Sequence, residues 1–238
     1  MNRKKRGILY GLALGDGHLS YRPQRGSNCE LIVGHSTKQA EYIHHKADLL
    51  LSVTGGSRAN IRPTKTFLKS TGKSYRGLRF SKTHKYFNQM HRVLYPKGKK
   101  VYTRKILDFL TEEGLALWFM DDGSMRCNRN KEGEVTSLFA DITTHCSKEE
   151  LEIIQEYFRE EWGIDVKASK SKGAWNVRFN TKACHRLASF IWPHMIPSME
   201  YKLRHLEDFV LRKSARHPHM DMKDDDIVQP QWNKNIEN

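Results

Sequence analysis

The chain has 238 residues, of which 38% are hydrophobic, which is enough for one large domain or two small ones with a packed core. Lysine and arginine number 41 against 27 acidic residues, so the net charge is +14, which points to a polyanionic partner and most often to a nucleic acid. Aromatic residues at 10%, together with regular apolar periodicity, exclude a disordered basic tail protein.

The four cysteines are scattered and form no C-x-x-C pair, so the sequence supports neither a zinc ribbon nor a redox dithiol. We expect free thiols in a reducing intracellular compartment, either a bacterial or phage-host cytoplasm or an organelle. The basic start is followed by an apolar run that contains Asp16 and soon turns polar, which indicates neither a signal peptide nor a membrane span. We therefore expect no secretion, no membrane association and no obligate protein partner.

The first predicted element is an apolar helix that starts near Ile8 and stops at the glycines beside Asp16. Gly7, Gly11 and Gly15 recur every four residues and therefore form a stripe along one face of this helix, which would let another helix approach closely. The expected partner is a second apolar helix that ends at Asp122. There Leu117 occupies the place that matches Gly11, so we expect an asymmetric contact in which a bulky side chain enters a groove.

The remainder of the first half alternates strands with helices. Residues 36–39 (STKQ) have the pattern of a capping box, and apolar residues at helical spacing follow them. Leu78 and Phe80 alternate with polar residues, which predicts a strand with one wet face. The helix that follows would end at Pro96. A connector rich in proline, glycine and lysine then leads to a short helix over about 104–110.

The second half repeats this order. Its capping box is at residues 147–150 (SKEE), and alternating strands are predicted around residues 138–143, 164–169 and 175–180. Each half therefore has the order helix, two strands, helix, two strands, helix, which predicts an α+β fold with antiparallel sheets. We assign residues 1–98 to the first half, 99–212 to the second and 213–238 to a polar tail.

Asp16 and Asp122 carry the chemistry in this interpretation. A carboxylate at the end of a helix is unfavourable, because the helix dipole makes that end negative. If the two apolar helices run parallel and side by side, both carboxylates emerge together, and divalent ions would relieve their repulsion. The expected cofactor is Mg²⁺, with Mn²⁺ able to substitute, acting in phosphodiester hydrolysis. No rival catalytic set, such as a P-loop or a nucleophile elbow, is visible in the sequence.

Two copies of one motif carry a resemblance to a known family. Residues 9–17 (LYGLALGDG) and 115–123 (LALWFMDDG) resemble the motifs of the LAGLIDADG homing endonucleases, in the single-chain form with two motifs. Leu14 and Met120 depart from the acid usual at the sixth place, and Leu117 from the glycine at the third, but both copies keep the acid before the last glycine. The resemblance covers about residues 7–206. It implies two pseudo-symmetric αββαββα halves that form a saddle of antiparallel sheets in a monomeric enzyme. Such an enzyme cleaves both strands of double-stranded DNA at a long asymmetric target and so promotes mobility of its host intron.

The resemblance also implies further site residues. One lysine per half assists cleavage, and Lys202 is the better match, whereas the choice of Lys100 over Lys99 is open. Gly15 and Asp121 are assigned to the metal site together with Asp16 and Asp122, and we expect the Asp121 carboxylate to be structural or an outer neighbour of the metal. Outward residues of the two sheets are expected to contact DNA: Arg22, Arg25, His35, Lys65, Arg79, Lys82, Arg126, Lys167, Lys170, Lys172, Asn176 and Arg178.

Two alternatives use the same scaffold without cleavage. One is an RNA maturase that binds its host intron RNA, and the other is a catalytically silent DNA-binding regulator. Paired acids at helix ends disfavour both, because neither task needs them. The sequence shows no protein-splicing flanks, which favours a free-standing or intron-encoded enzyme over an intein.

Overall fold

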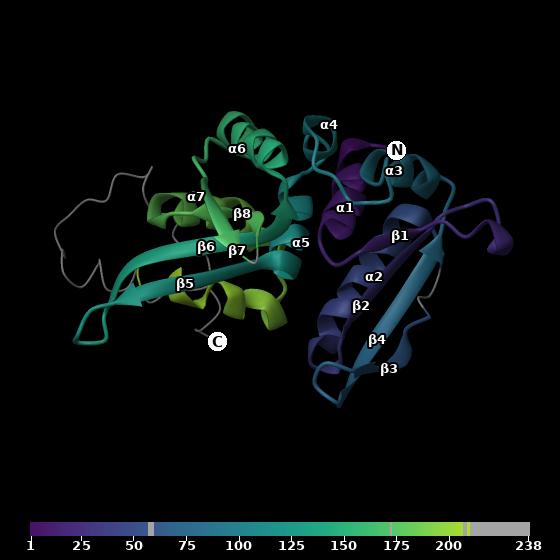
Figure 1. Ribbon diagram of the computed structural model, residues 1–238, viewed down its shortest axis with the longest axis horizontal. Helices are drawn as coiled ribbons and strands as arrows, with labels where there is room; N and C mark the ends of the chain where they lie inside the picture. Colours follow the sequence, from purple (N-terminus) through teal and green to yellow (C-terminus); the bar gives the residue numbers. More distant parts are fainter. Residues whose placement is uncertain (57–59, 172, 207–208, 210–238) are drawn as a thin grey trace, which may run out of the picture. The chain divides into compact units, whose positions relative to one another are not determined.

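The computed structural model describes residues 1–56, 60–171, 173–206 and 209 (Figure 1). The polar tail predicted for residues 213–238 lies outside them. The chain forms two compact units. Unit 1 contains Met1–Asp121 and Ile196–Met199, and unit 2 contains Asp122–Met195 and the residues from Glu200 onward. Each unit holds a four-stranded antiparallel sheet, so the expected α+β class with two antiparallel sheets is confirmed.

The sheet of unit 1 has the strand order β1-β2-β4-β3, and α2 packs against β2 and β4 on one of its faces (Figure 1). The regular elements of unit 1 are α1 (Arg3–Leu14), β1 (His18–Ser20), β2 (Glu30–Ser36), α2 (Ala40–Thr54), β3 (Arg62–Leu68), β4 (Lys73–Thr83), α3 (Tyr86–Leu94), α4 (Arg104–Leu107) and α5 (Glu112–Asp122), whose last residue begins unit 2.

The sheet of unit 2 has the corresponding order β5-β6-β8-β7, with α6 against β8 and α7 against β6. Its regular elements are β5 (Gly123–Arg129), β6 (Val135–Cys146), α6 (Lys148–Trp162), β7 (Lys167–Ser171), β8 (Ala174–Phe179) and α7 (Thr181–Ile191), followed by short 3₁₀ segments at Trp192–His194 and Pro197–Lys202. The order helix, two strands, helix, two strands, helix is thus confirmed for both halves of the sequence.

The boundary between the two compact units lies at a different residue from the boundary between the two sequence halves. Residues 99–121 belong to unit 1 by their contacts, although the sequence repeat assigns them to the second half. The helix α5 is buried on all sides from Gly114 to Met120, which is the pattern of a helix inside a core rather than on a surface. The division of the sequence at 98/99 remains a prediction about the repeat.

Three local predictions are corrected by the structure. Ser36 does not cap α2: its hydroxyl accepts from the Lys38 amide and caps a 3₁₀ turn over Thr37–Gln39, and α2 follows with no side-chain cap. The strand expected from residue 164 begins only at Lys167. The connecting helix α4 ends at Leu107 rather than near Leu110, although Thr103 caps its start.

Ser147, in contrast, forms the predicted capping box. Its hydroxyl accepts from the amide of Glu150, and the Glu150 carboxylate accepts from the Ser147 amide. The other end of α6 stops at Gly163, which has the left-handed conformation that favours glycine.

The predictions about thiols and membranes can be compared with the described residues. All four cysteines are free, and Cys29, Cys146 and Cys184 are buried. Burial raises the pKa of the Cys184 thiol to about 12, so this sulfur stays protonated near neutral pH. None of the helices in the described part of the chain has the length and apolar character needed to cross a membrane.

Candidate active site and nucleic-acid interface

The glycine stripe on α1 permits contact with α5 inside unit 1. A Cβ atom added at Gly7 would collide with Thr111, and one added at Gly11 would collide with the backbone of Gly114. The predicted stripe is therefore a helix contact surface. The expected entry of a bulky side chain into the groove is corrected at Gly11, because Gly114 lies there and the two backbones meet directly. Leu117 is buried, and its carbonyl accepts from the Tyr42 hydroxyl at 3.3 Å.

At the end of α1, Asp16 is fixed through its backbone to Asp121. The helix ends at Leu14, so Asp16 lies just beyond it with a side chain that is 44% exposed. Its amide donates to Asp121 Oδ2 at 2.8 Å. Gly15 is required here because a Cβ would collide with the same Asp121 carboxylate. The Asp121 side chain is fully buried, which agrees with the structural role expected for it.

A buried lysine compensates this buried acid. Lys46 comes from α2 and is fully buried, and its ammonium donates to Asp121 Oδ1, which also accepts from the Tyr42 hydroxyl at 2.9 Å. Lys46 Nζ lies 2.9 Å from His35 Nε2, and His35 Nδ1 lies 3.6 Å from Asp16 Oδ2. A buried charge is tolerated when it is paired and hydrogen-bonded, as these groups are.

Asp16, His35 and Asp121 also meet the geometric condition for a metal site, because one ligand atom of each lies within 4.8 Å of the others. Asp121 is poorly suited as a ligand, however. Both of its oxygens accept hydrogen bonds from protein groups, and the Lys46 ammonium supplies the positive charge that a cation would. The network therefore leaves Asp16 as the exposed carboxylate of this cluster.

The sequence interpretation missed Lys46 and Tyr42 and assigned His35 to DNA. The sequence nevertheless contained patterns that indicate buried positions for His35 and Lys46. His35 continues the alternation of the buried residues Leu31 and Val33, which assigns it to the helix-facing side of β2. Lys46 falls among the buried positions of α2, three residues after Ile43. A lysine at a core position indicates a buried acid nearby, because an unpaired one would be too costly.

Each unit has a lysine bound to the backbone beside its motif acid. In unit 1, Lys100 Nζ donates to the carbonyls of Leu14 at 3.1 Å and Gly15 at 2.9 Å. In unit 2, Lys202 Nζ donates to the Gly123 carbonyl at 2.8 Å. These are the two lysines selected from the sequence, and Lys99, the alternative to Lys100, is exposed.

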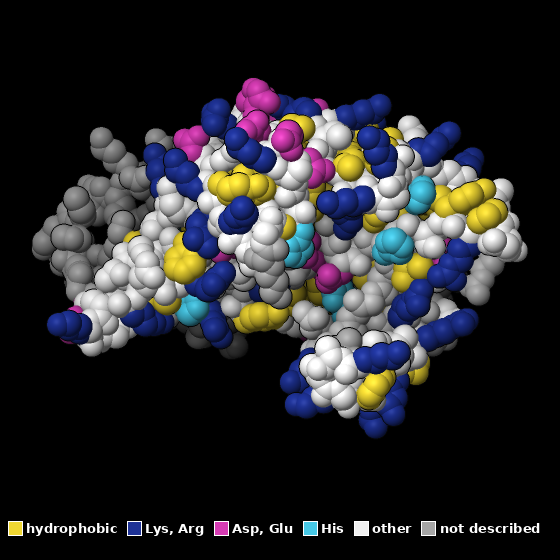
Figure 2. Space-filling model, viewed as in Figure 1, with side chains coloured by type: hydrophobic (Ala, Val, Ile, Leu, Met, Phe, Trp, Pro, Cys, Tyr) yellow, Lys and Arg dark blue, Asp and Glu magenta, His cyan; other side chains and the backbone are white. Residues whose placement is uncertain are grey.

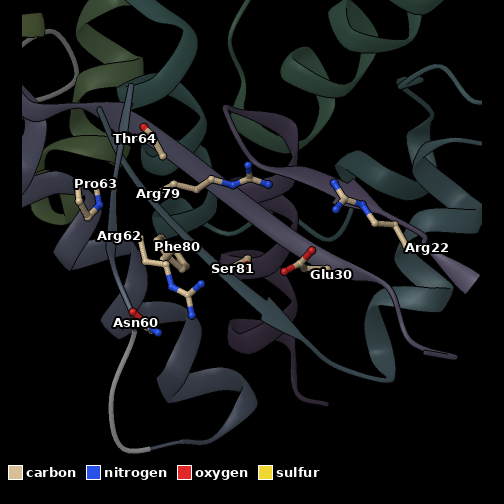
Figure 3. Close-up of a pocket in the computed structure, with 9 residues that line it drawn as sticks. All are labelled: Arg22, Glu30, Asn60, Arg62, Pro63, Thr64, Arg79, Phe80 and Ser81. Atoms are coloured by element: carbon tan, nitrogen blue, oxygen red, sulfur yellow. The ribbon is translucent and has the colours of Figure 1, made fainter. Parts of the chain in front are cut away.

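The polar face of the first sheet carries Arg79. Strand register assigns Arg62, Arg79 and Gly34 to one row across β3, β4 and β2. Figure 3 shows the Arg79 side chain extending along this face toward Arg22, with Ser81 and Glu30 drawn below the space between them. These residues line an open hollow of about 490 Å³ whose walls are mainly polar and charged, as a surface that contacts phosphates and base edges requires.

The polar face of the second sheet has a different arrangement, centred on Asp141. Arg178 donates to both Asp141 oxygens, from Nε at 2.8 Å and from Nη2 at 3.1 Å, and Arg126 Nη2 donates to Oδ2 at 3.0 Å. The hydrogen bonds that Arg178 itself donates to Asp141 raise the pKa of the Arg178 guanidinium. Ser169 donates to Oδ1 at 3.0 Å. Asp141 is therefore buried beneath two arginines that remain accessible.

Not all predicted DNA contacts share these polar faces. By strand register, Lys65 and Lys82 lie on the face opposite Arg79, and Lys170 lies opposite Arg178 with its ammonium 5.1 Å from the Trp175 ring centroid. His35 is buried on the helix side, so its assignment as an outward residue is corrected, whereas DNA contact by the three lysines stays a prediction. Lys167 is exposed in the row of Arg178. Arg25 lies in a 3₁₀ turn, and Lys172 lies outside the described residues.

Asn176 requires a separate correction. It lies on the polar face of β8 but is only 5% exposed. Its side-chain oxygen accepts from the amides of Thr144 and His145, where β6 is irregular and His145 has a positive φ of 48°. Asn176 thus satisfies backbone donors in a bulge rather than presenting its amide to a ligand.

Positive charge continues over the β3–β4 hairpin. Figure 2 shows Lys and Arg side chains in dark blue around this hairpin, and the sequence has no acidic residue between Asp48 and Asp108. Phe67 and Tyr75 are 59% and 48% exposed on the same hairpin. Cations interleaved with exposed aromatic rings are typical of nucleic-acid surfaces.

Comparison with known proteins agrees with these features. The family model described as "LAGLIDADG DNA endonuclease family" matches residues 6–187. Protein RecA of Mycobacterium shimoidei is 28% identical over 202 residues, which cover 82% of this chain and 45% of that protein. Cytochrome b mRNA maturase bI2 of Debaryomyces hansenii is 28% identical over 199 residues, which cover 82% of this chain and 72% of that protein. The chain spans about half the length of the RecA relatives.

Solved structures share the fold. The homing endonuclease I-WcaI bound to its DNA recognition sequence has a TM-score of 0.71 at 21% identity, over 85% of this chain and 86% of that one. The homing endonuclease I-GzeII in complex with its DNA target has a TM-score of 0.51 at 8% identity, over 90% and 92%. At these identities the likeness concerns the arrangement of helices and strands.

Proposed function

The chain belongs to the LAGLIDADG DNA endonuclease family, and we propose from that premise that it is a site-specific homing endonuclease. It cleaves both strands of a long asymmetric DNA target by metal-dependent phosphodiester hydrolysis and so promotes mobility of its host intron. It acts as a monomer, with one motif acid for each strand.

One observation carries this proposal: in both units a lysine ammonium donates to a backbone carbonyl of a residue adjacent to the motif acid. Asp16 follows Gly15, whose carbonyl accepts from Lys100, and Asp122 precedes Gly123, whose carbonyl accepts from Lys202. A binding protein has no need of this pairing in duplicate. An enzyme that hydrolyses two phosphodiester bonds needs an anion and a cation beside each of them.

The donor set at the end of α1 fits Mg²⁺ or Mn²⁺. The Asp16 carboxylate is a hard oxygen ligand with an exposed side chain, and it stands just beyond the negative end of α1, where Lys100 already bonds the carbonyls of Leu14 and Gly15. When bound, Mg²⁺ supplies positive charge that makes a nearby water more acidic and offsets charge on the leaving oxygen. We assign Asp121 to positioning rather than ligation, because Lys46 already neutralises it.

The chain's own residues perform the remaining tasks. The backbone hydrogen bond from Asp16 to Asp121 fixes where the exposed carboxylate stands. Lys100 and Lys202 hold a positive charge next to each acid and stabilise the negative charge that develops on the phosphate. The arginines of the two polar sheet faces hold the duplex in register.

A cleavage assay tests the proposal. A supercoiled plasmid library with a randomised insert is incubated with the protein and Mg²⁺, and the linearised members are sequenced to find the target. Cleavage should stop in EDTA, and specific binding should persist in Ca²⁺. Asp16→Asn or Asp122→Asn should abolish double-strand cleavage with the fold intact, whereas Asp108→Asn, an exposed acid paired with Arg104, should leave it unchanged. Full cutting in excess EDTA would contradict the metal requirement.

The maturase alternative has one observation in its favour, namely the similarity to the bI2 maturase over 72% of that protein. It predicts tight binding to the host intron RNA and faster splicing in vitro. An RNA-splicing assay run with the Asp16→Asn variant separates the two activities. Splicing that survives loss of cleavage would show that the RNA activity does not use the motif acids.

A further inference from the structure

We propose that Asp141 is a specificity-determining positioning residue that holds Arg126 and Arg178 for two guanines in neighbouring base pairs of the target. The inference rests on the proposed function, since it concerns how a DNA target is read. It assigns a role to an acid on a surface that must bind a polyanion.

The position of Asp141 within the sheet is the first ground. It lies on β6 between β5, which carries Arg126, and β8, which carries Arg178, and it is the direct register partner of Arg178. The Asp141 side chain is only 8% exposed, whereas Arg126 and Arg178 are 59% and 43% exposed. The acid is therefore covered by the arginines, and the arginines are what a ligand would meet.

The hydrogen-bond donors that remain on Arg178 are the second ground. A guanidinium has five N–H donors in a fixed plane. Asp141 accepts from Nε and from one hydrogen of Nη2, which leaves both hydrogens of Nη1 and one of Nη2. One donor on each terminal nitrogen is thus available, and this pair matches O6 and N7 of a guanine, the commonest specific contact of arginine.

The rigidity of the cluster is the third ground. Both guanidinium carbons lie 5.4 Å from the centroid of the Phe139 ring, so each arginine has a second restraint besides the carboxylate. Fixing a flexible side chain before binding lowers the entropy that binding must remove. Two guanidinium groups held on one carboxylate are also close enough to reach neighbouring base pairs, which are about 3.4 Å apart along a strand.

The charge of Asp141 is the fourth ground. An acid beneath two arginines reduces their attraction for any phosphate, which weakens sequence-independent binding. The same acid leaves bidentate recognition of guanine intact, because that contact depends on geometry. Asp141 should therefore lower nonspecific affinity and raise discrimination together.

The test is a binding profile of Asp141→Asn on the selected target, in Ca²⁺, with every base pair replaced in turn. Preference for guanine should fall on the order of 10-fold at two neighbouring base pairs and nowhere else. Affinity for a random duplex should rise. Asp165→Asn is the matched control, since it removes the same charge from an exposed pair with Arg159 and should change neither measurement.

A second variant guards against misfolding. Arg126→Gln leaves the Asp141–Arg178 pair in place, and it should lose preference at only one of the two base pairs. An equal loss at all positions for both variants, or an unchanged profile for Asp141→Asn, would overturn the inference while leaving target cleavage by the wild type intact. A wild-type protein that prefers no sequence would overturn the proposed function and this inference together.

Discussion

The two units share a topology but put their buried acid to different uses. Aligning Ser36 with Ser147 pairs three buried positions of α2 with three of α6, and Lys46 then corresponds to Tyr157. Unit 1 therefore has a buried cation where unit 2 has a phenol. On the polar face of the sheets, it is unit 2 that has the additional charged residue. Gly34 is the register partner of Arg79 in the first sheet, and Asp141 is the partner of Arg178 in the second.

The different positions of the buried acid show how the same fold can hold a motif acid in one unit and two arginines in the other. In unit 1 the buried acid lies on the helix side of the sheet, where it fixes the amide of Asp16. In unit 2 the buried acid lies on the polar side, where it fixes two arginines. Strand order is set by the apolar pattern common to both units, so single polar substitutions can specialise each unit without altering the fold.

The largest expected effect is on stability, from Lys46→Met. This substitution leaves Asp121 buried without its cation, and the loss of one partner of a buried pair costs about 3–5 kcal/mol. Urea unfolding measures the change. Lys38→Met removes an exposed lysine and should alter the free energy of unfolding by less than about 0.5 kcal/mol. Adding Asp121→Asn to Lys46→Met should recover part of the loss, and failure to recover would show that Lys46 contributes packing rather than charge.

The fold was predictable from the sequence because it depends on patterns of apolar residues. Alternation identified β4, β6 and β8, and helical spacing identified α2 and α6. The first capping box failed because the motif letters do not distinguish an α-helix from a 3₁₀ turn. The start of β7 was misplaced because Ile164 and Val166 are buried without being paired in a strand.

For the candidate site, the motifs and the resemblance were enough to nominate the two motif acids and the two lysines, and the catalytic roles of these residues stay predictions. The Lys46–Asp121 pair was not found because it joins residues 75 positions apart, and only the folded chain brings them together. Asn176 was misassigned because an asparagine in a strand can serve the backbone or a ligand, and a bulge in β6 determined which.

The next effect concerns the lysines and compares the two motif sites directly. Lys202→Met should slow cleavage of one strand on the order of 10²-fold by removing charge stabilisation, and Lys100→Met should slow the other strand. Nicked circles should then accumulate from supercoiled plasmid. Single-turnover cleavage with each strand labelled, at saturating enzyme, measures both rates. Lys99→Met is the control for Lys100, and unchanged rates with weaker binding alone would remove either lysine from the catalytic set.

A smaller effect on DNA binding should follow from introducing an acid into the first sheet at the position that corresponds to Asp141. Gly34→Asp would introduce a carboxylate beside Arg79, and the added Cβ would lie 3.7 Å from the Leu78 carbonyl, which is ordinary contact. We expect weaker binding to random DNA and a gain of about 1 kcal/mol in discrimination at the base pair that Arg79 contacts. Gly34→Asn has a similar shape without the charge and should produce neither change. Equal effects of the two variants would mean that shape, not charge, distinguishes the sheets.

The smallest effect compares the starts of α2 and α6. Ser147→Ala removes a complete capping box from a 15-residue helix and should lower the free energy of unfolding by about 1 kcal/mol. Ser36→Ala removes a cap from a three-residue 3₁₀ turn, and its hydrogen bond to the Lys38 amide is 3.3 Å long, so the loss should be only a few tenths of a kcal/mol. Urea unfolding of both variants under identical conditions measures the difference. Equal losses in the free energy of unfolding would show that Ser36 stabilises α2 through the turn that precedes it. The two serines would then contribute equally to stability, although only Ser147 caps an α-helix directly.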